Sequence, residues 1–168
     1  ILFPSLASNY RLILPLPAKS LLEDQKERVE KYLKKFSLLY KNREVSLVED
    51  TGSKMYRWIY KNGELVKNKR TSNPKRHLYK GNVILTTIDK FLYRYFGFGD
   101  KQKSFTFPLR IHKEKTLIAF DEAHSYDEIS FTNFYSLVKS LYEAGRSIVL
   151  MTATMPEKCQ EKFEFLDT

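Results

Sequence analysis

The stretch Thr116–His124 reads TLIAFDEAH. Its first half is a short, continuous apolar run, which is typical of a strand buried on both faces of a parallel sheet. Asp121 and Glu122 follow directly, so we expect both carboxylates at the carboxyl edge of the sheet, where α/β folds bind ligands. There Asp121 could hold Mg²⁺ on a nucleotide phosphate, and Glu122 could position or activate an attacking water. A strand that simply ends in polar residues is the alternative interpretation.

A second apolar run, Ser147–Met151, leads into Thr152-Ala153-Thr154 and predicts another sheet strand. DEAH followed by TAT, in this order and at this spacing, is hard to produce by chance. A helix that ends at Gly145 is predicted between the two runs. Its apolar face consists of Phe131, Phe134, Tyr135, Val138, Leu141 and Tyr142.

The DEAH and TAT sequences resemble motifs II and III of the superfamily 2 helicases, which are nucleic-acid-dependent ATPases with two RecA-like domains. The resemblance implies an α/β fold, a RecA-like three-layer sandwich with a mostly parallel sheet. It also implies ATP and Mg²⁺ as cofactors, and it adds His124, Thr152 and Thr154 to Asp121 and Glu122 as catalytic residues. Imidazole and hydroxyl groups can exchange hydrogen bonds between the nucleotide side and the nucleic-acid side of the domain. These three residues would therefore couple nucleotide hydrolysis to the bound nucleic-acid strand.

The longer sequence DEAHSYD, residues 121–127, resembles the helicase subunit of type I CRISPR interference, in which D-E-x-H-x-Y-D is usual. The implied partners are single-stranded DNA, an RNA-guided CRISPR surveillance complex and an HD nuclease. The nuclease requires adjacent His and Asp, a pair that does not occur in this chain. Two alternatives stay open: a fragment of another superfamily 2 DNA-repair or RNA helicase, and a non-catalytic module that docks nucleic acid or protein.

The phosphate-binding P-loop, G-x-x-x-x-G-K-[ST] or Walker A, does not occur in the 168 residues, since none of the six glycines is followed by lysine. Residues 1–9 read as the end of a helix followed by turn residues. By resemblance, this would be the helix after the P-loop. We therefore expect residues 1–168 to be part of the first RecA-like domain, with an incomplete sheet that lacks the P-loop strand. The P-loop segment and a second RecA-like domain are then further partners, and the isolated fragment is predicted to be inactive.

Residues 17–25, PAKSLLEDQ, resemble helicase motif Ia, with Ala18 in place of the usual Thr. In the family this loop and the following helix start grip the nucleic-acid backbone, which implies that Pro17, Lys19 and Ser20 bind nucleic acid here. A hydroxyl, a lysine charge and free backbone amides at a helix start all suit phosphate. The alternative is that Ser20 only caps the helix.

Asn82–Leu85 is a predicted strand, and Thr86 and Thr87 follow it. The segment resembles helicase motif Ib, whose hydroxyls and helix start contact backbone phosphate, so both threonines are candidate nucleic-acid ligands. Asp89 is expected to cap the following helix, Lys90–Phe96.

Residues 51–80 are predicted to form a hairpin and a basic loop, as an insertion in the domain. Asn62-Gly63 separates two strand-like runs, and this dipeptide favours a type I′ turn because both positions need a positive φ. Tyr56, Trp58 and Tyr60 alternate on one side of the first run. They form either a stacking platform for a single strand or, more often for such a stripe, the buried face of the hairpin. Residues 67–80 and 97–115 are predicted to be basic surface loops.

The formal net charge of +9 indicates a partner of opposite sign, most commonly nucleic acid, although lysine-rich surfaces also serve solubility. A chain of 168 residues with 42% hydrophobic residues suits one globular domain. Cys159 is the only cysteine, so no internal disulfide can form and a cytoplasmic location is expected. No apolar run is long enough for a membrane span, so no membrane partner is expected.

Overall fold

The computed structural model describes residues 1–51, 54–71, 81–96, 115–121, 128–152 and 157–166. The strands are β1 (Arg11–Leu16), β2 (Val45–Thr51), β3 (Lys54–Lys61), β4 (Glu64–Thr71), β5 (Val83–Thr87), β6 (Thr116–Asp121) and β7 (Ser147–Met151). The helices are α1 (Leu2–Ala7), α2 (Ser20–Leu39), α3 (Ile88–Phe96), α5 (Glu128–Glu143), α6 (Glu157–Gln160) and the 3₁₀ helix η2 (Glu161–Phe163). No described helix is long and apolar enough to cross a membrane.

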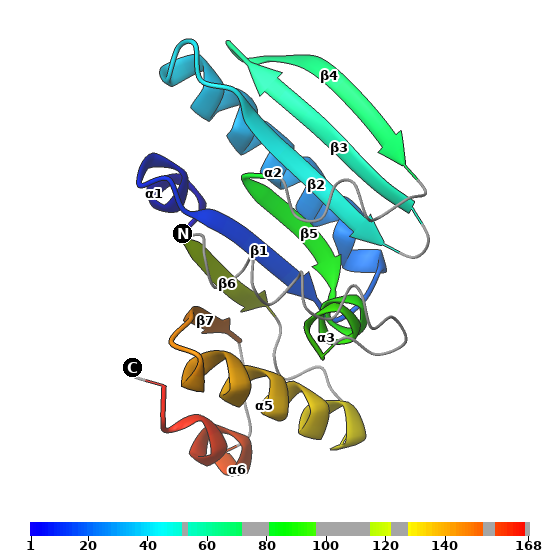
Figure 1. The fold of residues 1–168 in the computed structure, drawn as a ribbon, viewed down its shortest axis with the longest axis vertical. Coiled ribbons are helices and arrows are strands. Elements are labelled where there is room, and N and C mark those ends of the chain that lie inside the picture. Colours follow the sequence, from blue (N-terminus) through cyan, green and yellow to red (C-terminus); the bar gives the residue numbers. More distant parts are fainter. Residues whose placement is uncertain (52–53, 72–80, 97–114, 122–127, 153–156, 167–168) are drawn as a thin grey trace.

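The strands form one mixed sheet in the order β4-β3-β2-β5-β1-β6-β7, drawn in Figure 1. β2, β5, β1, β6 and β7 run parallel to one another, whereas β3 pairs antiparallel with both β2 and β4 at one edge. Helical crossovers join parallel strands and place helices on the faces of the sheet. The expected mostly parallel α/β sheet is confirmed.

Two apolar clusters cover the two faces of the sheet because side chains alternate along each strand. Ile13 and Ile118 face one side and pack with α3 and α5, for example with Phe134. Leu12 faces the other side and packs with α1 and α2, for example with Leu33. Figure 1 shows α5 and α2 on opposite sides of the strands. The sheet is therefore the middle layer of a three-layer sandwich.

The first strand differs from the sequence prediction, which ends it at Leu14 because proline cannot donate to a ladder. β1 instead continues through Pro15, which is paired with Thr86 of β5. The amide of Arg11 donates to Lys115 beside β6, and the next amide donates towards β5. The nitrogen of Pro15 therefore faces β6, and the pairing of β1 with β6 ends before it, at Ile13. No ladder bond to β5 is lost.

The hairpin forms around Asn62 and Gly63, whose φ angles of 52° and 83° are both positive, as a type I′ turn requires. Its second strand is longer than predicted, because β4 pairs with β3 as far as Thr71. Residues 67–71 are thus strand rather than loop. Residues 64–70 are exposed and mostly charged, which is how natural proteins discourage pairing at an edge strand. The rest of the predicted loop, residues 72–80, and most of the predicted loop 97–115 lie outside the described residues.

The aromatic stripe of β3 is the buried face of the hairpin. Trp58 and Tyr60 are only 8% and 1% exposed and belong to the cluster under α2. Lys26 of α2 lies with Nζ 4.0 Å from the centre of the Trp58 ring. Burial raises the pKa of Tyr60, and the nearby carboxylate of Glu30 raises this pKa further. The interpretation of this stripe as a base-stacking platform is therefore wrong, because α2 covers the rings of Trp58 and Tyr60.

Replacing Gly63 by Ala is expected to lower the free energy of unfolding by about 1 kcal/mol, because a positive φ strains a residue with a Cβ atom. A clash is not the cause, since the added Cβ would lie 3.5 Å from the nearest atom, in Leu38. Urea unfolding would measure the change. Asn62→Gly is the control, since glycine also accepts positive φ, and it should leave stability nearly unchanged. Equal losses in both variants would contradict the strain explanation.

Candidate functional site

Four parallel strands, β1, β5, β6 and β7, end at the same edge of the sheet. In Figure 1 the arrowheads of β1 and β5 lie beside the start of α3. We call this side the carboxyl edge. Pro17, Thr87, Asp121 and Thr152 lie at or just beyond the ends of the four strands. Ligands of open α/β sheets bind at such an edge.

Asp121 is the last residue of β6, and its side chain is partly exposed. Gln25 of α2 donates an Nε2–H bond to Asp121 Oδ2 over 3.3 Å. This bond links the second half of the motif Ia segment to the DEAH segment, 96 residues further along the chain. The structure therefore brings two separate helicase-like motifs together at the carboxyl edge.

Thr152 is exposed and follows the end of β7, where Met151 is paired with Asp121 of β6. The first hydroxyl of the TAT sequence is thus one residue beyond the strand partner of the aspartate. Glu122, His124 and Thr154 lie outside the described residues. Of the five catalytic candidates, the structure describes Asp121 and Thr152, and it brings these two strand ends together.

The start of α2 carries Lys19 and Ser20 in exposed positions. Lys19 occupies the cap position and no side chain caps the helix, so the interpretation of Ser20 as a helix cap is wrong. The amides of Leu21 and Leu22 donate to the carbonyls of Ala18 and Lys19 in a tight first turn. These two amides are therefore used internally. The exposed side chains of Lys19 and Ser20 are polar groups that this helix start can offer to a ligand.

Thr86 and Thr87 have different environments although they are adjacent. Thr86 is fully buried and its hydroxyl donates to the carbonyl of Asp50 over 3.0 Å, so this side chain faces the interior and not a ligand. Thr87 is partly exposed, and its Oγ1 accepts the amide of Lys90 over 3.3 Å. Thr87 thus caps α3, because the helix begins directly after it at Ile88. The predicted cap by Asp89 is wrong.

Asp50 and Arg94 form a buried ion pair that sequence reasoning missed. Both Asp50 carboxylate oxygens accept bonds from the guanidinium group, and the Nη2–Oδ1 distance is 2.9 Å. The two side chains are only 2% and 7% exposed. The pair joins the end of β2 to α3, directly behind Thr86. One signal was present in the sequence: Arg94 shares the buried face of an amphipathic helix with Phe91 and Tyr95.

The described residues contain no group of three or more potential metal ligands. Asp121 alone still fits Mg²⁺ in type, because this ion prefers carboxylate oxygen and is held through one or two carboxylates plus substrate phosphates. Asp121 is partly exposed and lies at the carboxyl edge. The observed donor is thus compatible with a nucleotide-bound magnesium ion, although it is only one part of such a site.

A family model described as DEAD/DEAH box helicase matches residues 2–162. The chain belongs to the DEAD/DEAH box helicase family. A comparison with curated proteins found no match. Family membership confirms the resemblance to superfamily 2 helicases, and together with the three-layer sheet it confirms the RecA-like fold. A DEAD/DEAH helicase domain binds nucleic acid, and such domains generally use ATP and Mg²⁺.

Proposed function

We propose that this helicase domain acts in an ATP-dependent single-stranded DNA translocase of type I CRISPR interference. The observation that carries the proposal is the sequence DEAHSYD, which begins with the last residue of β6. Its first four residues are the family's motif II, and the following Ser-Tyr-Asp is the narrower resemblance. The net charge of +9 supports a polyanionic partner.

In this proposal Asp121 holds Mg²⁺ on the phosphates of ATP, and Glu122 positions the attacking water. The metal ion supplies positive charge that offsets charge developing on the phosphates during transfer. Gln25 orients the Asp121 carboxylate through the 3.3 Å bond. His124, Thr152 and Thr154 pass the state of the nucleotide to the bound strand, and the exposure of Thr152 at the neighbouring strand end supports this role.

A P-loop segment is proposed to pair with β7. β7 is the edge strand of the described sheet, and four of its residues, Ile148, Val149, Leu150 and Met151, are apolar and only partly covered. An uncovered apolar edge strand is a template for another strand. A strand there would bring a phosphate-binding loop beside Asp121 at the carboxyl edge. A second RecA-like domain would close the nucleotide site from outside.

The nucleic-acid strand is proposed to cross the start of α2 and the end of β5. Lys19 and Ser20 offer an exposed charge and an exposed hydroxyl, and Pro17 sets the loop that precedes them. Thr87 contributes at the end of β5. The contribution of Thr86 is limited to its main chain, because its hydroxyl is buried.

Lys19→Gln is expected to weaken binding of single-stranded DNA roughly 3- to 10-fold, because one phosphate contact is lost. The slope of log K against log salt should become shallower by about 0.7. Fluorescence anisotropy with a labelled oligothymidylate would measure both changes. Lys35→Gln is the matched control, since it removes the same charge from an exposed site about 24 Å further along α2. Equal effects of the two changes would remove the start of α2 from the nucleic-acid interface.

The function itself is tested with an enzyme that contains this domain and a P-loop. ATP hydrolysis should be stimulated by single-stranded DNA more than by RNA, and translocation should run from 3′ to 5′. An RNA-guided surveillance complex bound to its target should stimulate the enzyme further, and an HD nuclease should cleave the translocated strand. Preferential stimulation by RNA, or indifference to the surveillance complex, would favour another superfamily 2 helicase.

A further inference from the structure

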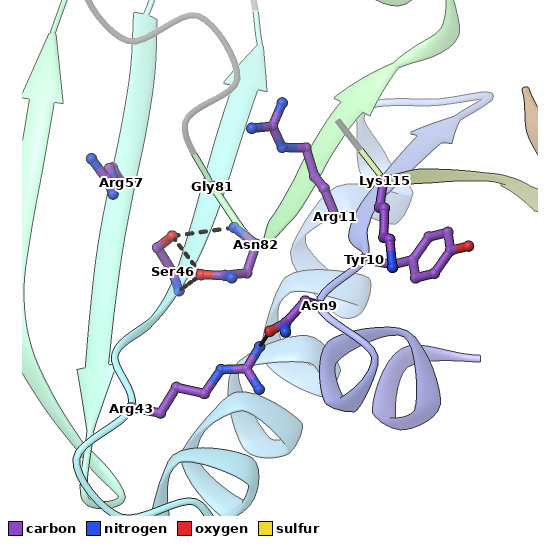
Figure 2. Close-up of a pocket in the computed structure, with 9 residues that line it drawn as sticks. All are labelled: Asn9, Tyr10, Arg11, Arg43, Ser46, Arg57, Gly81, Asn82 and Lys115. Carbon is purple, nitrogen blue, oxygen red and sulfur yellow. Dashed lines mark hydrogen bonds between the residues drawn. The ribbon is translucent and has the colours of Figure 1, made fainter. Parts of the chain in front are cut away.

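A cavity of about 470 Å³ lies at the amino ends of the parallel strands, on the side of the sheet opposite the carboxyl edge (Figure 2). Arg11 begins β1, Lys115 directly precedes β6, and Asn82 directly precedes β5. Arg57 of β3 and Arg43, just before β2, complete the wall. Five segments that are far apart in the sequence therefore contribute side chains to one cavity.

Among the described residues that line the cavity, the charged side chains are all positive. Four of the nine lining residues are cations, namely Arg11, Arg43, Arg57 and Lys115, and none of the nine is a carboxylate. In the part of the chain that the structure describes, no ion pair involves Arg43 or Arg57. Two guanidinium groups without a carboxylate partner attract an anion, so an anion that enters the cavity would be stabilised by Arg43 and Arg57.

Arg43 is positioned by neutral groups. Its guanidinium donates to the carbonyl of Leu6 over 2.8 Å and to Oδ1 of Asn9, and it lies 5.3 Å from the centre of the Phe36 ring. These contacts orient the side chain but leave its charge uncompensated. A guanidinium group held in this way is prepared for a planar, two-oxygen contact with phosphate.

Arg57 supplies a second observation that points to a ligand. Its Nε atom is buried and has no hydrogen-bond partner within the described residues. A buried charged donor without a partner costs free energy, and buried polar groups are almost always bonded. Arg57 is opposite Val48 in the register of β2 and β3, so its side chain is on the same face of the sheet as the α3 and α5 layer. An anion in the cavity would provide the absent acceptor.

Asn82 adds a neutral donor whose orientation is settled by its contacts. Its Oδ1 accepts the amide of Ser46 over 2.9 Å and the hydroxyl of Ser46 over 3.1 Å. Two donors on one oxygen identify that atom as the carbonyl oxygen of the side chain, so the NH₂ group is the part of Asn82 left for another partner. Figure 2 draws these bonds beside the cationic side chains. The cavity thus offers donors and positive charge together, which is the chemistry of an anion site.

We propose that this cavity is a second anion site of the domain and binds a phosphate group. A volume of about 470 Å³ accommodates a phosphate with the sugar attached to it. The phosphate belongs either to the backbone of a nucleic acid that also crosses the carboxyl edge or to a small phosphorylated molecule. The proposal is independent of the proposed function, because it needs neither ATP hydrolysis nor the DEAH segment.

The test uses the 168-residue chain with Arg57→Gln and Lys115→Gln combined. The matched control combines Arg70→Gln and Lys35→Gln, which removes one Arg and one Lys from exposed positions outside the cavity. Pyrophosphate at millimolar concentration should raise the melting temperature of the wild type and of the control, and it should have no effect on the cavity variant. The affinity for a labelled oligothymidylate identifies the source of the phosphate. A fall in its affinity of 10-fold or more in the cavity variant alone indicates a nucleic-acid backbone, and an unchanged affinity indicates a small phosphorylated molecule.

Asn82→Asp keeps the test decisive if the double variant does not fold. The substituted carboxylate can still accept both bonds from Ser46, but it replaces the donor NH₂ group by a negative oxygen. It should abolish the stabilisation by pyrophosphate while circular dichroism stays unchanged. The proposal is overturned if the cavity variants and the control respond identically to both pyrophosphate and the oligonucleotide. The ATPase assay with the larger enzyme tests the proposed function, and the pyrophosphate assay tests the cavity. A negative result in the first assay does not change the second, so failures of the two proposals can be told apart.

Discussion

Arg94→Met is expected to lower the free energy of unfolding by about 3 to 5 kcal/mol, because it leaves the carboxylate of Asp50 buried without its partner. Asp50 is only 2% exposed, so water cannot replace the lost guanidinium group. The effect should reach the candidate site, since Asp50 also accepts the hydroxyl of Thr86 at the end of β5. Urea unfolding monitored by circular dichroism would measure the loss.

Two controls separate burial from charge. Lys31→Met breaks the ion pair of Lys31 with Glu27, whose side chains are about 70% exposed, and it should leave stability unchanged within error. The double variant Asp50→Leu with Arg94→Met removes both charges and should recover most of the loss, since a buried pair can be replaced by apolar residues at little cost. A double variant as unstable as Arg94→Met would show that packing of the long side chain, and not the unpaired carboxylate, causes the loss.

The 168-residue chain is expected to hydrolyse ATP no faster than a buffer blank, because its sequence contains no G-K-[ST] to bind the phosphates. An arginine supplied by a second domain would also be absent, and such an arginine contributes roughly 10³- to 10⁵-fold to turnover. A phosphate-release assay with and without single-stranded DNA would measure the rate. The binding of single-stranded DNA should persist, since it depends on other residues.

Glu122→Gln is the control for this expectation. In the isolated chain it should change nothing, whereas in an enzyme with a P-loop it should lower kcat by about 10²- to 10⁴-fold if Glu122 acts on the attacking water. Turnover by the isolated chain that disappears in Glu122→Gln would mean that the chain hydrolyses ATP without a Walker A lysine. That result would contradict the assignment of phosphate binding to a separate segment.

Local patterns predicted much of the secondary structure. The apolar run before Asp121 forms β6, and the Asn62-Gly63 turn forms the hairpin with both φ angles positive. These features depend on a few consecutive residues, whose side-chain alternation and backbone preferences act within one element. Family membership could likewise be recognised from motifs, because the DEAH and TAT sequences are contiguous. Glu122 and His124 lie outside the described residues, so their roles stay predictions.

Errors arose where the outcome depended on a neighbouring strand or helix. Pro15 was expected to end β1, but the nitrogen of Pro15 faces a side where pairing has already stopped. Ser20 was considered as a helix cap and Asp89 was expected to be one, whereas Thr87 caps α3 and no side chain caps α2. In each case the local rule was correct, and the register or helix start that decided its application was set by tertiary packing.

The amino-acid sequence by itself determined the family, the alternation of strands and helices, and an aspartate at the end of a buried strand. Only the tertiary structure decided that Thr86 faces inward, that Asp50 pairs with Arg94, and that basic residues from four segments share a cavity. The physical reason is distance along the chain. Periodicity and turn preference act over a few residues, whereas these contacts join residues tens of positions apart, and they exist only once strand order and register have been established.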